Sequence, residues 1–309
     1  MKKTILITVA AVLLLGVASC NKDQDGVYNP KKKISKIYLS YESEYCWDGE
    51  TDTYSAPRHL SEQWDWDGNL LVSRTSYGSG GSIVDTYTYT YDGKRLSRVD
   101  WNDLSQNVTG YTTFSYDGKE LMSADVYSGY GTPSYDCTYR FTHTDSKITR
   151  IEYSGGNKKA GFHNNNIIMD ILFPMDIQTK NRAAYLQARK ASKDLDVYIY
   201  EITWSGNNIS QIKMSKGSWS ATFAYTYDGK KNPFYGMWRY LEFDPEDLDK
   251  NNVQTRTYSN TDMYRSNSTY TYTYSDDYPM TCTVKSSEND LQTMNWENST
   301  DRYEYEYLK

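Results

Sequence analysis

The sequence has few of the residues that carry the common catalytic and metal-binding chemistries. It contains three His and four Cys in 309 residues. None of His59, His143 and His163 has the spacing of a zinc motif or of a nucleophile with its base. No glycine-rich segment follows an expected strand and opens a helix, as a phosphate-binding loop requires. The sequence therefore predicts no metal site, no cofactor and no catalytic residue.

Excess basic charge is also missing. The formal net charge is -6, and the only basic run is Lys31, Lys32 and Lys33. Because proteins that bind nucleic acids need a basic surface, we expect no nucleic-acid partner.

Phenylalanine is scarce, but other aromatic residues are abundant. The chain has 7 Phe against 32 Tyr and 8 Trp, and hydrophobic residues make up only 38%. A mean hydropathy of -0.80 alone would suggest disorder, yet disordered chains are poor in aromatic residues. Tyrosine and threonine are favoured in strands, and a buried tyrosine ring keeps a polar tip. The composition therefore predicts a strand-rich fold with a tyrosine core.

Residues 1–20 have the pattern of a bacterial lipoprotein signal peptide. Two lysines precede an apolar stretch at 5–17 that is too short to span a bilayer comfortably. It ends in Val17-Ala18-Ser19-Cys20, which resembles a lipobox, so Cys20 is the predicted lipidation site. Attached acyl chains would anchor the protein, since each buried CH2 adds about 0.8 kcal/mol. The alternative is an ordinary secretory signal with an incidental cysteine.

A polar tether is expected at 21–33, between the lipid and a single domain at 34–309. Asp23 and Asp25 follow the cysteine closely. Acidic residues at this place resemble the surface-export signal of Bacteroidetes lipoproteins, interrupted here by Lys22 and Gln24. The expected location is the outer membrane of the cell envelope, with the protein either exposed at the surface or facing the periplasm.

Three cysteines remain after Cys20. Cys46, Cys137 and Cys282 are an odd number, so at most one disulfide can form within the chain. They are expected to be small strand residues, with a bridge from Cys46 as the alternative.

A hairpin pattern recurs along most of the chain. In residues 85–92 threonines and tyrosines alternate and therefore point to opposite faces of a strand. Asp-Gly then predicts a tight turn into a second strand, because both residues tolerate positive φ. The motif occurs at Trp66-Asp67-Gly68, Tyr91-Asp92-Gly93 and Tyr116-Asp117-Gly118, so the repeat is 25 residues (66 to 91, 91 to 116).

The returning strands share apolar residues three positions apart, such as Leu96 and Val99. In a regular strand this spacing places the two side chains on opposite faces. Either a β-bulge resets the parity or the strand is covered on both sides, and we favour the bulge.

The repeats predict an all-β fold, an antiparallel up-and-down meander of about 14–16 strands. A sheet of this size curls or closes, so it should be strongly rolled or barrel-like. Membrane barrels carry an apolar outward band. Here one strand face consists of Thr, Ser, Lys, Asp and Glu, so the aromatic face is expected to turn inward.

One segment breaks the repeat. Residues 155–196 include an alanine-rich stretch that predicts a helical insert at about 175–193. We expect it to cap or fill one end of the rolled sheet. The alternative is a lid over a ligand site.

Two segments carry a family resemblance. Residues 227–236 (YDGKKNPFYG) and 272–279 (YTYSDDYP) resemble Bacteroidetes lipoproteins of the DUF4595 type, whose function is unknown and whose fold is described as porin-like. The hairpins also resemble the tyrosine–aspartate (YD) repeats of Rhs-type shells. The first resemblance implies a porin-like fold for most of the mature chain and implies no activity. The chain lacks the Arg-rich repeat ends of long YD arrays, so it gives no support to a toxin-encapsulating role.

The absence of a catalytic constellation favours a non-catalytic, lipid-anchored binding or scaffold module. Its partner would be a glycan or another envelope protein, and its membrane contact would be the N-terminal lipid. The candidate ligand-facing aromatics are Trp47, Trp64, Trp66 and Trp101, because flat rings beside polar neighbours suit sugar faces. The alternatives are a carbohydrate-active hydrolase that uses Asp and Glu carboxylates and a purely structural envelope protein.

Overall fold

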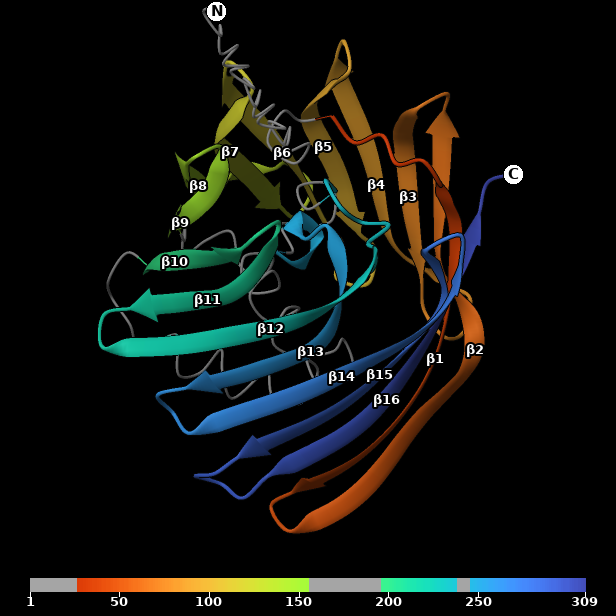
Figure 1. The fold of residues 1–309 in the computed structure, drawn as a ribbon, viewed down its shortest axis with the longest axis vertical. Coiled ribbons are helices and arrows are strands. Elements are labelled where there is room, and N and C mark those ends of the chain that lie inside the picture. The colour runs from red at the N-terminus through yellow and green to blue at the C-terminus, as the bar shows by residue number, and fades with distance from the viewer. Residues whose placement is uncertain (1–26, 156–195, 238–244) are drawn as a thin grey trace, which may run out of the picture.

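The chain folds into a closed barrel of 16 antiparallel strands in a computed structural model, which describes residues 27–155, 196–237 and 245–309 (Figure 1). The strands are β1 (Ile34–Trp47), β2 (Glu50–Asp67), β3 (Leu70–Tyr77), β4 (Ile83–Asp92), β5 (Arg95–Asp103), β6 (Val108–Asp117), β7 (Glu120–Gly129), β8 (Ser134–Thr144), β9 (Lys147–Gly155), β10 (Asp196–Ser205), β11 (Asn208–Lys216), β12 (Trp219–Lys231), β13 (Asn251–Asn260), β14 (Tyr264–Ser275), β15 (Tyr278–Asp290) and β16 (Trp296–Tyr307).

Each strand pairs with its neighbours in sequence, and β1 pairs with β16 to close the barrel. The closing register places Ile37 opposite Tyr305 and Tyr45 opposite Glu297. The prediction of an all-β, up-and-down, barrel-like meander is therefore confirmed. We call the end where β1 begins and β16 finishes the entry end, and the other the opposite end.

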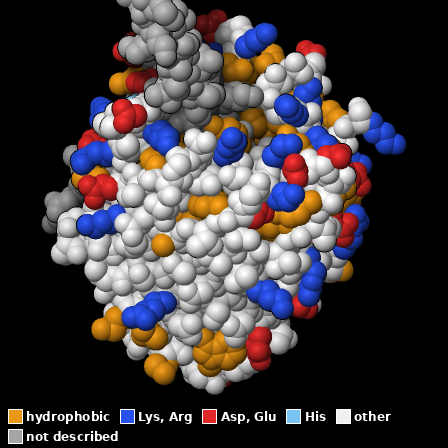
Figure 2. Space-filling view, in the orientation of Figure 1, with side chains coloured by type: hydrophobic (Ala, Val, Ile, Leu, Met, Phe, Trp, Pro, Cys, Tyr) orange, Lys and Arg blue, Asp and Glu red, His pale blue; other side chains and the backbone are white. Residues whose placement is uncertain are grey.

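The strand faces are divided as the tyrosine–threonine alternation predicts. On β4, Tyr87 and Tyr89 are buried, whereas Thr88 and Thr90 are exposed. On β14, threonines face outward between inward tyrosines. On the face shown in Figure 2, hydrophobic side chains are scattered among charged side chains. Membrane-spanning barrels have the reverse arrangement, with an apolar outer band.

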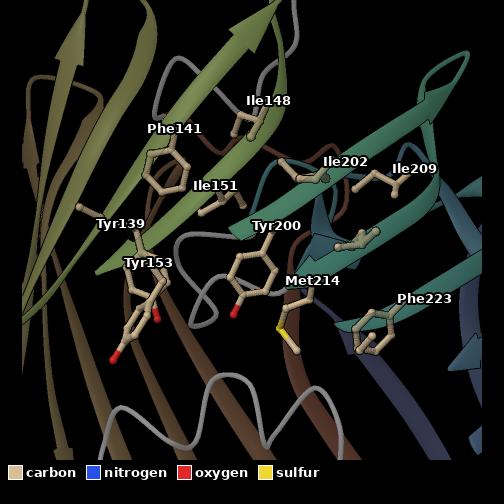
Figure 3. Packing of buried hydrophobic residues seen from close by; sticks show 14 of the residues in the cluster. Tyr139, Phe141, Ile148, Ile151, Tyr153, Tyr200, Ile202, Ile209, Met214 and Phe223 are labelled. Carbon is tan, nitrogen blue, oxygen red and sulfur yellow. The ribbon is translucent and has the colours of Figure 1, made fainter. Parts of the chain in front are cut away.

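The inward side chains form two hydrophobic clusters. One lies on β7–β13, where Ile and aromatic side chains of β8–β11 point toward one another (Figure 3). The other lies mainly on β1–β6 and β15–β16 and includes Trp64, Leu71 and Tyr305. These side chains supply the hydrophobic stabilisation of the fold.

A β-bulge resets the parity of the returning strands, as expected. Thr90 pairs with Arg98 and Tyr91 pairs with Leu96, so Ser97 is the extra residue. Leu96 and Val99 are consequently both buried. Register shifts at the equivalent positions recur in the hairpins β2–β3, β6–β7, β8–β9 and β10–β11.

The turns at the entry end are tight. Gly93 has φ 62° and Gly118 φ 55°, which L-residues rarely adopt. Where Gly is absent, Asp145 and Ser146 take positive φ themselves. The connection between β12 and β13 is longer and contains the 3-10 helix η2 (Pro245–Leu248).

Four expectations lie outside the described residues: the signal peptide with Cys20, the acidic tether residues Asp23 and Asp25, His163, and the helical insert at 175–193. The last residues of the expected tether are packed on the barrel. Tyr28 is buried, and its hydroxyl donates to the Pro233 carbonyl at 2.7 Å. Within the described ranges, no helix has the length and hydropathy to span a bilayer.

Candidate ligand site in the barrel lumen

A cavity of about 420 Å³ lies inside the barrel. Its wall combines aromatic, charged and hydroxyl side chains from β1–β3, the β12–β13 connection and β13–β16. The lining residues include Glu62, Arg74, Phe234, Asp247, Asn252, Arg256, Tyr270, Tyr272, Ser286, Asp301, Tyr303 and Tyr305. Small-molecule sites usually measure about 300–1,000 Å³, so this cavity has the size for a small ligand.

The β2–β3 wall carries an ion pair. Arg74 Nη1 lies 3.6 Å from Glu62 Oε1, and Trp64 Nε1 donates to Glu62 Oε2 at 2.7 Å. Glu62 and Trp64 are two residues apart on one strand, so both face inward. The Arg74 guanidinium also lies 4.0 Å from the ring centroid of Tyr87. These contacts fix the carboxylate and the guanidinium in one orientation.

The β13–β16 wall carries a second polar group. The register places Arg256 opposite Ser268, and Ser268 opposite Ser286. The two serine hydroxyls are 2.8 Å apart. Asp301 follows on β16, in line with Val284. Arg256, Ser286 and Asp301 all line the cavity, so this wall offers both donors and acceptors.

Glu288 lies on the same inner face, one inward position beyond Ser286. It is 5% exposed, and burial raises the pKa of its carboxyl. Hydrogen bonds from Tyr264 and Ser266 and the charge of Arg256 oppose this rise in pKa. The Tyr264 hydroxyl donates to Glu288 Oε2.

Tyrosines supply the aromatic part of the wall. Burial raises the pKa of Tyr272, Tyr303 and Tyr305 well above the usual value. Their hydroxyls therefore stay protonated near neutral pH. The Tyr272 hydroxyl donates to the Val253 carbonyl at 3.0 Å.

The β12–β13 connection forms one side of the cavity. The Phe234 ring is 6.0 Å from that of Trp64 and 6.1 Å from that of Tyr305, between centroids. Asn232 fixes the local turn, because its Oδ1 accepts from Phe234 N and its Nδ2 donates to the Asp249 carbonyl.

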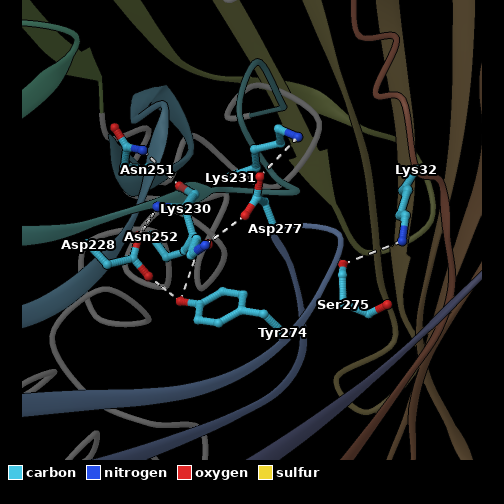
Figure 4. A network of polar contacts seen from close by, with 9 residues as sticks. All are labelled: Lys32, Asp228, Lys230, Lys231, Asn251, Asn252, Tyr274, Ser275 and Asp277. Atoms are coloured by element: carbon cyan, nitrogen blue, oxygen red, sulfur yellow. Dashed lines mark hydrogen bonds and ion pairs between the residues drawn. The ribbon is translucent and has the colours of Figure 1, made fainter.

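Charged residues hold this connection to the β14–β15 turn (Figure 4). Lys230 Nζ donates to Asp277 Oδ1 at 2.7 Å, and Lys231 Nζ is 3.7 Å from Asp277 Oδ2. The hydrogen bond raises the pKa of Lys230 and lowers that of Asp277. The Tyr274 hydroxyl donates to Asp228. These side chains are exposed, so we expect each ion pair to contribute little to the stability of the fold.

The four candidate tryptophans lie in different environments. Trp64 is 2% and Trp101 6% exposed, and both belong to the core. Trp66 is half-buried, with Nε1 donating to the Ile34 carbonyl at 2.8 Å. Trp47, at the β1–β2 turn, is 45% exposed and is the one of these four that bulk solvent reaches freely.

A tyrosine row on the outer wall does not form an open platform. The Tyr111 and Tyr127 rings stack at 4.6 Å, and Tyr135 contacts Tyr127 edge-on. The Arg98 guanidinium lies 3.7 Å from the Tyr111 centroid, and its hydrogen bond with Asp100 raises the pKa of Arg98. The ring faces of Tyr111 and Tyr127 thus contact neighbouring side chains.

The other sequence candidates do not gather at the cavity. His59 is partly exposed, and its Nδ1 lies 2.9 Å from the Pro57 carbonyl. His143 Nδ1 lies 3.9 Å from a Glu120 carboxylate oxygen. Cys46, Cys137 and Cys282 lie on strands and are not joined by a disulfide. In the part of the chain that the structure describes, no group of three or more His, Cys, Asp and Glu could hold a metal.

Sequence reasoning missed the charged residues of the cavity. Asp301 shares its strand face with Tyr303 and Tyr305 in the motif Asp-Arg-Tyr-Glu-Tyr. The alternation of side chains along this strand would have been enough to predict that the Asp301 carboxylate points into the barrel. Arg74 and Arg256 similarly occupy inward positions, at which charge is unusual and indicates a polar lumen.

The cavity suits a polyhydroxylated ligand without excess charge. Its lining combines positively charged arginines, negatively charged carboxylates, hydroxyl groups and flat aromatic rings. Tyrosine rings can pack on the apolar faces of a sugar ring, and the mixed donors and acceptors can bind its hydroxyls.

No family model and no curated protein sequence matches this chain. Among solved structures, it is similar to a porin-like protein from Bacteroides uniformis, with a TM-score of 0.50 and 11% identity. The match covers 92% of this chain and 100% of that protein. At this identity the likeness concerns the fold alone, so the chain shares a porin-like barrel fold with that protein.

Proposed function

We propose that this protein is a lipid-anchored envelope protein whose barrel lumen binds a small neutral saccharide without transforming it. The observation that carries the proposal is the cavity, where tyrosine rings lie beside fixed charged and hydroxyl groups. Glu62 is already engaged by Arg74 and Trp64, which suits recognition of ligand hydroxyls better than proton transfer.

The anchoring part of the proposal rests on the sequence. The lipobox around Cys20 and the following Asp23 and Asp25 support an outer-membrane lipoprotein. The motifs similar to DUF4595-type lipoproteins and to YD repeats support a Bacteroidetes envelope origin, and the porin-like fold is compatible with it.

Calorimetric titration of the folded protein with neutral and uronic-acid oligosaccharides tests the lumen. We expect a neutral saccharide to bind and Asp301→Asn to weaken its affinity about tenfold or more, a loss of about 1.4 kcal/mol. Asp92→Asn, in an exposed turn, is the matched control and should leave affinity unchanged. Absence of binding by every saccharide, or equal effects of both variants, would overturn the proposal. Release of reducing ends during the titration would instead indicate the hydrolase.

Fractionation tests the anchor. Chain with Cys20 should partition with membranes and take up labelled palmitate, and Cys20→Ala should do neither. Membrane association of Cys20→Ala equal to the parent would contradict lipidation.

A further inference from the structure

Exposed apolar side chains gather at the opposite end of the barrel, on three adjacent hairpin ends. Met263 ends the β13–β14 turn, Leu291 and Met294 lie in the β15–β16 loop, and Trp47 lies at the β1–β2 turn. Their exposed fractions are 58%, 45%, 76% and 45%, respectively. We call these four residues the far ridge. Figure 2 shows hydrophobic side chains at the lower edge of the molecule, where these hairpins end in Figure 1.

Hydrogen bonds join the hairpin ends into one surface. Leu291 N donates to the Met263 carbonyl at 3.3 Å. Asp48 N donates to Asn295 Oδ1 at 3.0 Å. The four side chains are therefore held by linked backbone segments rather than by independent loops.

The backbone at both methionines is unfavourable for a methionine. Met263 has φ 63° and Met294 φ 61°. The other non-glycine residues with positive φ in the described chain are Asp, Asn and Ser, namely Asp48, Asn107, Asp145, Ser146, Asp276 and Asp277. A long side chain in this region costs roughly 1–2 kcal/mol. Because both side chains are exposed, packing in the core does not offset that cost. Contacts with a partner that covers the two side chains would offset it.

Carboxylates flank the residues of the far ridge along the chain. Asp48, Glu50 and Asp52 follow Trp47, and Asp262 and Asp290 precede Met263 and Leu291. Nearby basic residues are fewer: Arg265 and Lys216. A second copy of the same surface would bring like charges together, and anionic lipid headgroups would be repelled. A complementary partner therefore has basic groups around an apolar centre.

From this we propose that the far ridge is a docking surface for another protein, whose apolar hollow is rimmed by Lys or Arg. Flexible methionine side chains adapt to the hollow, and Trp47 provides a large rigid anchor. The surface lies at the opposite end of the barrel from Tyr28, which packs beside Trp66 and Pro233 at the entry end. The inference does not depend on the lumen ligand.

Site-specific photocrosslinking in the native envelope tests this surface. A photoreactive residue is placed at 263 or 294 and, as controls, at 122 or 280, whose methionines are exposed elsewhere on the wall. We expect one discrete adduct from the ridge positions only. Adducts of the chain with itself, adducts with lipid alone, or equal adducts at all four positions would overturn the proposal.

Affinity of the purified adduct partner for the folded barrel provides the second measurement. The double variant Met263→Asn with Met294→Asn keeps the turns, because Asn tolerates positive φ. We expect its affinity to fall at least about tenfold with no loss of stability in urea. Affinity should also fall with rising salt. Met280→Thr is the matched control. Unchanged affinity in the double variant, or affinity independent of salt, would contradict the proposed partner chemistry.

Discussion

The hydroxyl of Tyr91 donates a hydrogen bond to the main-chain carbonyl of Leu71, 20 residues earlier, at 2.6 Å. Leu71 is the residue beside the bulge of the preceding hairpin. The next repeat has the same bond from Tyr116 to the Leu96 carbonyl at 2.9 Å. Trp204 makes an equivalent bond to the Ile148 carbonyl at 2.8 Å. In these three hairpins the aromatic residue before the turn therefore has a defined role: it bonds a carbonyl beside a neighbouring bulge.

Removing this hydroxyl should destabilise the barrel. We expect Tyr91→Phe to lower the free energy of unfolding by about 1 kcal/mol, because a buried carbonyl loses its donor. Urea denaturation followed by circular dichroism measures the change. Tyr130→Phe is the control, since this side chain is 58% exposed, and its effect should be below about 0.5 kcal/mol. Equal losses in both variants would show that the bond has no special role.

Much of the fold was predictable because its determinants are local. The alternation in β4 and the Asp-Gly turn at Gly93 specify a hairpin without reference to distant residues. The bulge at Ser97 was predictable from the spacing of Leu96 and Val99. Closure between β1 and β16 was expected only as one of several rolled forms, since their register joins the two ends of the chain and no local pattern encodes it.

The candidate site was harder to predict. Its charged residues come from distant strands, such as Arg74 on β3 and Arg256 on β13. The bulges between them change which of the alternating residues of a strand point inward. The flat rings of the tryptophans are what makes them candidates for sugar contact. Trp64 and Trp101 are instead core residues, since a large ring on an inward position is buried whether or not a ligand exists.

Gly110 should tolerate no side chain. It lies directly opposite Trp101, and a Cβ placed there would overlap the Trp101 indole and the Tyr127 carbonyl oxygen. We expect Gly110→Ala to lower the free energy of unfolding by about 1–3 kcal/mol or more. In Gly78→Ala the nearest atom would be Ser82 Oγ at 3.5 Å, an ordinary contact. Comparing the two midpoints in urea checks this, and a wild-type midpoint for Gly110→Ala would contradict the packing of Trp101.

Glu288 should make stability depend on pH. Burial raises the pKa of its carboxyl in the folded state, so the folded chain binds the proton more tightly than the unfolded chain. Stability contributed by this group is present at low pH and is lost as pH rises through the folded pKa. We expect Glu288→Gln to be more stable than the parent at pH 7.5 and to approach it near pH 4. Urea unfolding at both pH values measures the difference, and a constant difference would contradict the assignment.

The thiols of the folded barrel should react in a defined order. Cys137 is fully buried and Cys282 is 3% exposed, whereas Cys46 is only partly buried. A thiol reagent should therefore label Cys46 first and the other two only on unfolding. In denaturant, mature chain isolated from membranes should have three reactive thiols, because a lipidated Cys20 carries a thioether instead of a thiol. Mass spectrometry of the labelled peptides counts them. A fourth thiol in that material would contradict lipidation of Cys20, and early labelling of Cys137 would contradict its burial between β7 and β9.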